Sequence, residues 1–301
     1  MDFMQSLTLE SASERNAGAL ARLLPRLHVK AFTGGVIVLL FIFVGILGPA
    51  FAPLDPNKQE LTAMMQAPQG LGSLHLLGTD NLGRDIFSRV IHGSRVSLLV
   101  AFAVVFVSGL IGISLGAISG YFGGRIDFLI QKLVEVIWAF PPLLLGITIM
   151  AFLGQGLFNL ILALVAQRWI PYCRVVRGQT LSLRSRDFVT AARSLGSGSF
   201  MIIVRHIIPN LVHTSLVIGT FAMASSIIAE ASLSFLGVGV PPHIPTWGTM
   251  LADARIYIST AWWMPLFPGL CIFITVLGIN LLGDALRDLL DPRLKRTGSG
   301  I

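Results

Sequence analysis

Long apolar runs alternate along this chain with short polar segments, which is the pattern of a protein that crosses a membrane several times. A membrane-spanning helix needs about 20 predominantly apolar residues. The run at 157–166 is interrupted by Gln167 and Arg168. We expect it to continue through Trp169 to Val175 with its polar face turned inward. The pattern predicts an all-α membrane protein with six spans, built on the apolar blocks 31–53, 96–120, 133–153, 157–166, 211–229 and 261–283.

Two of these spans carry features that bear on helix packing. Gly112, Gly116 and Gly120 recur at every fourth position of the second span, so this face lets another helix approach closely. Pro141 and Pro142 interrupt the third span near its middle. The carbonyls that lose their helical partners there must be satisfied by protein groups or by cavity water. We assign both features to the packing of a helix bundle.

A polar segment at 187–210 separates the fourth and fifth apolar blocks. Its first part has one apolar stripe at i, i+3, i+4 and i+7, formed by Phe188, Ala191, Ala192 and Leu195. Gly196 follows, where a left-handed helix cap costs least. A second apolar run, 200–208, ends at Pro209. This pattern predicts a helix–Gly–helix hairpin that offers a rigid docking surface to a partner.

The charged residues indicate how the chain is oriented in the membrane. Only 12% of the 301 residues are charged, against about 25% in soluble domains. If both termini lie on one side, that side holds 17 of the 22 lysines and arginines, and the other side holds five: Lys58, Arg84, Arg89, Arg95 and Arg255. Basic residues collect on the cytoplasmic side. We therefore expect both termini and the hairpin in the cytoplasm, and we take the basic charge as a sign of topology rather than of nucleic-acid binding.

These features divide the chain into five parts. They are a cytoplasmic tail at 1–30, a first transmembrane helix at 31–53, an external segment at 54–95, a transmembrane core at 96–285 with a cytoplasmic loop at 184–210, and a cytoplasmic tail at 286–301.

The sequence offers no chemistry of its own. None of the four lysines follows a glycine, which excludes a P-loop. The His and Cys residues have no zinc spacing, and no G-x-S-x-G motif occurs. Asp80 to Gly83 is similar to the start of a calcium loop, but Ile91 stands where an EF-hand needs its Glu. We expect no metal site, no cofactor and no enzymatic activity, so any energy must come from a partner.

The hairpin resembles the EAA loop of ABC importer permeases. The resemblance rests on Thr190-Ala191-Ala192, then Gly196 after three residues, then Ile208-Pro209. Four further segments are similar to the C-type permease of the peptide/nickel importer family: LGTDNLGRDIFSR (77–89), EASLSFLGVGV (230–240), TWGTML (246–251) and NLLGDALRDLLDPRL (280–294). Two positions depart from the family pattern, because Thr190 replaces its Glu and His206 its hydrophobic residue.

This resemblance implies a fold, partners and a mechanism. The fold would be the six-helix bundle of type I ABC importer permeases in a bacterial cytoplasmic membrane. The partners would be a sister permease, two ATPase subunits that bind ATP and Mg²⁺, and an extracytoplasmic substrate-binding protein. ATP binding would pull on the coupling loops and rock the bundles from inward to outward facing, and the cargo would be a short peptide.

The resemblance also implies candidate site residues. The ATPase-coupling loop would comprise Asp187, Phe188, Thr190, Ala191, Ala192, Leu195, Gly196, Arg205, His206 and Pro209. Glu230 and Phe235 are candidates for the pathway or outer gate. The candidates for contact with the binding protein are Asp80, Arg84, Asp85 and Trp247.

Two alternatives stay open at this point. The same machinery would import nickel chelates or glutathione if its binding protein selected them. A stand-alone proton-coupled secondary transporter would need a titratable relay in its core, whereas this chain places its charges in a cytoplasmic docking loop.

Overall fold

The computed structural model describes residues 29–70 and 72–290, and this part of the chain folds into helices joined by turns and loops. The first helix spans Val29–Phe51, and a short turn of 3-10 helix, η1, follows at Leu61–Ala63. The remaining elements are α2 (Ile86–Phe122), α3 (Gly124–Trp138), α4 (Pro142–Leu153), α5 (Leu157–Leu183), α6 (Asp187–Ser194), α7 (Ser199–Ile202), the π-helical turn η2 (Ile203–Ile207), α8 (Ile208–Phe235), α9 (Trp247–Ala254) and α10 (Trp263–Leu290).

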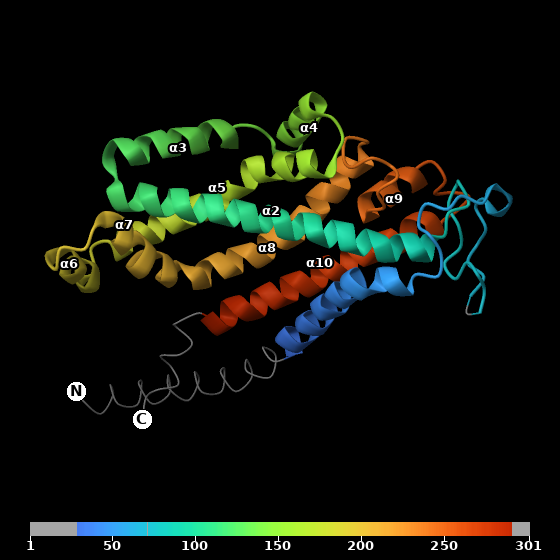
Figure 1. Ribbon diagram of the computed structural model, residues 1–301, viewed down its shortest axis with the longest axis horizontal. Helices are drawn as coiled ribbons and strands as arrows, with labels where there is room; N and C mark the ends of the chain where they lie inside the picture. The colour runs from blue at the N-terminus through green and yellow to red at the C-terminus, as the bar shows by residue number, and fades with distance from the viewer. Residues whose placement is uncertain (1–28, 71, 291–301) are drawn as a thin grey trace, which may run out of the picture.

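The long helices account for the predicted spans. Four are long and apolar enough to cross a membrane, and α3 with α4, which meet at a bend of 88°, make a fifth if counted as one broken span. The other predicted span is α5, which has 27 residues and is more polar because it carries Gln167 and several arginines. The hairpin of α6 and α7 lies at one end of the bundle, and the external segment with α9 lies at the opposite end (Figure 1).

The glycine face of α2 packs directly against α5. A Cβ atom on Gly116 would lie 2.6 Å from the carbonyl oxygen of Cys173, and one on Gly120 would lie 2.7 Å from Cβ of Thr180. Any larger side chain would push the two backbones apart. The predicted close approach along Gly112, Gly116 and Gly120 is therefore confirmed.

A side chain of α5 satisfies two backbone carbonyl groups at the break between α3 and α4. The amide Nε2 of Gln167 donates hydrogen bonds to the carbonyl oxygens of Ile137 at 3.3 Å and Phe140 at 2.8 Å. These carbonyls precede Pro141, where the helix stops. The sequence predicted that protein or water would fill this role, and the structure identifies Gln167.

The helix that leaves the hairpin is longer than the sequence predicted. We expected the second apolar run to end at Pro209, but α7, η2 and α8 form one helical segment, Ser199–Phe235. Pro209 is tolerated because it lies at the start of α8, directly after the π-helical turn. The hairpin is thereby continuous with a full span.

Candidate functional site

The first helix of the hairpin ends in the predicted glycine cap. Gly196 adopts φ +83°, which favours glycine. Its N–H donates to the carbonyl of Arg193 at 3.0 Å, and the N–H of Ser197 donates to the carbonyl of Ala192 at 3.1 Å. This pair of bonds is the Schellman arrangement. The reversal between α6 and α7 is thus fixed by backbone hydrogen bonds.

One face of the hairpin is anchored on the bundle. Val189 and Ala192 of α6 are buried and pack against buried side chains of α2, α5 and α8 at the hairpin end of the bundle. We call this cluster the hairpin core; it consists of Ala117, Tyr121, Val176, Val189, Ala192, Ile202, Ile203, Ile207 and Leu211. The predicted single stripe is wrong at Ala192, because α6 has apolar residues on two faces and Ala192 belongs to the inner one.

The other face of the hairpin is exposed and apolar. Leu195 is 87% exposed and Phe200 is 78% exposed. Phe188 and Ala191 are exposed on the same helix as Leu195. We call Phe188, Ala191, Leu195 and Phe200 the docking face. A rigid element that presents apolar side chains to solvent is typical of a protein interface.

The remaining candidates of the loop are polar or lie where α8 begins. Asp187 is exposed in the first turn of α6, where a negative charge suits the helix dipole. The hydroxyl of Thr190 donates to the carbonyl of Arg186 at 3.3 Å. Arg205 and His206 lie in the π-helical turn, and Pro209 follows it, exposed. The structure brings all ten candidates together in one hairpin.

The candidates for external contact are not on the surface. Asp80, Arg84 and Asp85 are at most 5% exposed and Trp247 is fully buried, so the prediction that they contact a binding protein is wrong. Their charges and polar atoms are used inside the chain. The indole Nε1 of Trp247 donates to the carbonyl of Val90 at 3.2 Å and holds α9 against α2.

A network of buried and half-buried charges ties the external segment to α9. We call Asp80, Arg84, Arg89 and Asp253 the outer ion cluster. Arg84 donates from Nε to Asp80 at 2.6 Å and from Nη2 to Asp253 at 2.8 Å. The guanidinium of Arg89 lies 3.7 Å from Asp80 and 3.5 Å from Asp253. The sequence could not show that Asp253 pairs with Arg84, because the two residues lie far apart along the chain.

Asp85 begins α2 instead of facing a partner. Its carboxylate accepts a hydrogen bond from the N–H of Ser88 at 2.8 Å, as an N-cap residue does. The other oxygen lies 3.2 Å from Nδ1 of His75. The polar motif at 77–89 is therefore a device that fixes the start of a span.

Glu230 does not line an open surface either. Its side chain is 1% exposed, and it accepts hydrogen bonds from the hydroxyls of Ser97 at 3.3 Å and Ser234 at 2.9 Å. It joins α8 to α2, so its assignment to the pathway lining is wrong. Phe235 ends α8 and is 41% exposed, and its role at an outer gate stays a prediction.

A groove with a few polar side chains in a mainly apolar wall lies beside the break between α3 and α4. Two adjoining hollows of about 410 and 260 Å³ share Pro142, Gln167 and Arg168 in their walls. The guanidinium of Arg168 donates to the hydroxyl of Ser225 at 2.7 Å and to its carbonyl at 2.9 Å. We call this the Arg168 groove. The sequence predicted an inward polar face at Gln167 and Arg168 but not the contact between Arg168 and Ser225.

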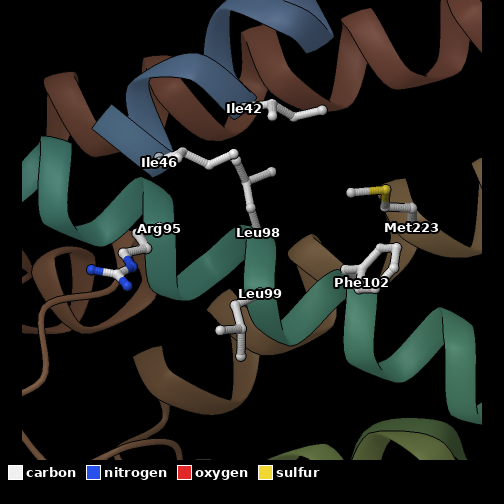
Figure 2. A pocket seen from close by; sticks show the side chains of 8 residues that line it. Ile42, Ile46, Arg95, Leu98, Leu99, Phe102 and Met223 are labelled. Atoms are coloured by element: carbon white, nitrogen blue, oxygen red, sulfur yellow. The ribbon is translucent and has the colours of Figure 1, made fainter. Parts of the chain in front are cut away.

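A second groove lies between the first helix and α2. It has a volume of about 370 Å³ and is lined by aliphatic, aromatic and methionine side chains, with Arg95 at one end (Figure 2). The guanidinium of Arg95 points away from Ile42 and Met223 (Figure 2). This lining offers a polar solute almost no hydrogen-bond partner, so the Arg168 groove is the better candidate for a pathway.

Comparison with known proteins identifies the family. Residues 112–296 match the model of the binding-protein-dependent transport system inner membrane component, and residues 27–68 match the N-terminal transmembrane domain of oligopeptide transport permease C. The first match covers more than half of the chain. The chain belongs to the family of inner-membrane components of binding-protein-dependent transport systems. It is therefore a multi-pass inner-membrane transport subunit.

Similar proteins of this family come from several bacteria. The chain is 42% identical to the di/tripeptide transport system permease protein DppC of Pseudomonas aeruginosa, over 89% of this chain and 90% of that protein. It is 41% identical to the glutathione transport system permease protein GsiD of Pectobacterium atrosepticum, over 90% and 89%. It is 38% identical to the oligopeptide transport system permease protein OppC of Bacillus subtilis, over 88% and 86%.

A solved structure confirms the fold class. A chain of the inward-facing MetNI methionine ABC transporter matches with a TM-score of 0.54 and 16% identity, over 67% of this chain and 97% of that chain. The predicted type I ABC importer permease bundle is therefore confirmed.

Proposed function

We propose that this chain is the permease subunit of an ATP-driven importer of short peptides and that its hairpin is the joint with the ATPase subunits. The peptide cargo is supported by relatives named as di/tripeptide and oligopeptide permeases. Glutathione is the second candidate cargo, because a similar relative is named for it.

The exposed docking face carries this proposal. Leu195 and Phe200 are held in a hairpin whose inner face is fixed by the hairpin core and whose reversal is fixed by Gly196. Covering an apolar surface with a partner contributes about 25 cal/mol of stabilisation for each Å² of apolar area removed from water. A groove on an ATPase subunit is the partner that this surface suits.

The proposal includes the rest of the assembly. A sister permease completes the pathway, two ATPase subunits hold ATP and Mg²⁺, an extracytoplasmic binding protein delivers the cargo, and this chain binds no cofactor itself. The hairpin and both termini lie in the cytoplasm. Four arginines lie in the hairpin or directly before it, which supports this orientation: Arg184, Arg186, Arg193 and Arg205.

The continuous helix from the hairpin supplies a mechanical route. The segment Ser199–Phe235 runs from the hairpin through the membrane and carries Ser225 of the Arg168 groove and Glu230 of the contact with α2. When the ATPase subunits close, the hairpin moves with them, and this helix carries the displacement to the groove. The bundle thereby alternates between inward-facing and outward-facing states.

Leu195→Asp tests the docking face. A carboxylate in an apolar interface loses its hydration without gaining a partner, so we expect the ATPase subunits to co-purify at least tenfold less with the variant. The matched control is Ile258→Asp, which makes the same kind of change at a 64% exposed residue in the connection between α9 and α10. Equal recovery of the ATPase with both variants would refute the proposed joint.

A further inference from the structure

Arg168 places a positive charge at the middle of a span. At about 1.5 Å per residue, it lies roughly 17 Å along α5 from Leu157 and roughly 22 Å from Leu183. Within residues 29–70 and 72–290, no carboxylate oxygen lies within 4.0 Å of this guanidinium, so it forms no ion pair there. A charge at this depth is too costly to face lipid. The side chain must therefore face the interior of the assembled transporter.

The guanidinium is held in place but has donors to spare. The carbonyl and hydroxyl oxygens of Ser225 accept two of its hydrogen bonds, and this hydroxyl in turn donates to the carbonyl of Ala222 at 3.1 Å. Arg has five N–H donors in a planar fork. Three remain for a ligand, and their orientation is fixed because Ser225 holds the other two.

The surroundings leave the groove positively charged. Arg174, six residues further along α5, lies over the ring of Trp138 at 4.6 Å, and that ring also lines the groove. The two carboxylates of α3 are already paired, Asp127 with Arg177 through two hydrogen bonds of 2.6 Å and Glu135 with Lys132 at 2.7 Å. Among the described residues, the groove thus presents the guanidinium of Arg168 and is lined by no carboxylate.

We propose that the Arg168 groove binds the C-terminal carboxylate of the peptide during translocation. This inference rests on the proposed function. A carboxylate matches the planar fork of a guanidinium, and charge-assisted hydrogen bonds are roughly twice as strong as neutral ones. The contact offsets the cost of bringing a charged chain end to the middle of the membrane, so Arg168 is a specificity-determining residue of the pathway.

The test compares a dipeptide with a free carboxylate and the same dipeptide with a C-terminal amide. The complete transporter is reconstituted in liposomes and supplied with a saturating amount of loaded binding protein, so that capture of the cargo does not limit the rate. We expect the maximal ATP-dependent uptake of the free acid to exceed that of the amide about tenfold in the wild type. We expect Arg168→Gln to reduce the ratio of free-acid to amide uptake to about one, whatever its effect on the absolute rates. The control Arg125→Gln removes an exposed charge outside the groove and keeps the preference.

Each outcome decides the inference. Equal maximal rates for the acid and the amide in the wild type would overturn it, whether or not Arg168→Gln assembles. Arg168→Gln lowering both rates equally would also overturn it and would point instead to an acidic side chain of the sister permease. If Arg168→Gln fails to assemble, Arg168→Lys keeps the charge but lacks the planar fork, and it is expected to reduce the preference for the acid; an unchanged preference would overturn the inference. A lack of ATP-dependent uptake of either dipeptide would overturn the proposed function together with this inference.

Discussion

Charged side chains at the outer end of this protein stabilise its own structure. In the outer ion cluster, Arg84 and Arg89 share Asp80 and Asp253, and Arg89 is only 1% exposed. Taking such charges out of water is costly unless each has a partner. The cluster therefore depends on all of its members, and the external segment stays against α9 because they are paired.

Asp80→Ala tests this dependence. The variant leaves two buried guanidinium groups with one carboxylate and removes the acceptor for the N–H groups of Leu82 and Arg84. We expect a loss of stability on the order of 3–5 kcal/mol, the range for breaking a buried ion pair. Thermal unfolding of the purified complex measures it. Lys132→Ala, which breaks the exposed pair with Glu135, is the control and should have little effect. A similar unfolding temperature for both variants would contradict the account.

At the scale of the elements, glycine spacing decides how the bundle closes. Gly116 and Gly120 bring the backbone of α2 against α5, and this contact places Gln167 and Arg168 at the broken span. The proximity of helices in a membrane is set by small residues rather than by hydrophobic exclusion. The position of the groove thus follows from the glycine face.

Gly116→Ala tests the glycine face. A Cβ atom there would meet the carbonyl oxygen of Cys173 at 2.6 Å, which neither backbone can avoid without moving. We expect a lower unfolding temperature and a loss of stability of roughly 1–3 kcal/mol, as for overpacking. Gly178→Ala on α5 is the matched control, because nothing lies within 4 Å of its Cβ position. A neutral Gly116→Ala, or an equal loss in the control, would argue against the close packing.

Local patterns in the sequence predicted most of the long helices and several of their breaks, but not the continuation of the helix through Pro209. The cap at Gly196, the glycine face of α2 and the stop at Pro141 follow from rules about neighbouring residues. Those rules do not show which face of α6 the bundle covers, and Ala192 was therefore placed on the wrong face. They also do not show that Asp80 and Asp253, or Arg168 and Ser225, meet across the fold. Buried and exposed charges look the same in a sequence, which is why Asp80, Arg84 and Glu230 were misassigned.

At the scale of the whole molecule, the docking face and the outer ion cluster lie at opposite ends of the bundle, and the Arg168 groove lies between them. The hairpin presents its docking face at one end, and the outer ion cluster holds the external segment at the other (Figure 1). Between them, the segment Ser199–Phe235 carries Ser225 past the Arg168 groove. This arrangement suits a subunit that receives motion in the cytoplasm and changes its shape at membrane depth.

The central claim is that this motion comes from ATP hydrolysis by partner subunits. The most direct test measures uptake of a labelled dipeptide into proteoliposomes that contain this chain with its sister permease and both ATPase subunits. We predict uptake that requires ATP and the loaded binding protein and that persists when a protonophore abolishes the proton gradient. Uptake by this chain alone, driven by a proton gradient without ATP, would contradict the account.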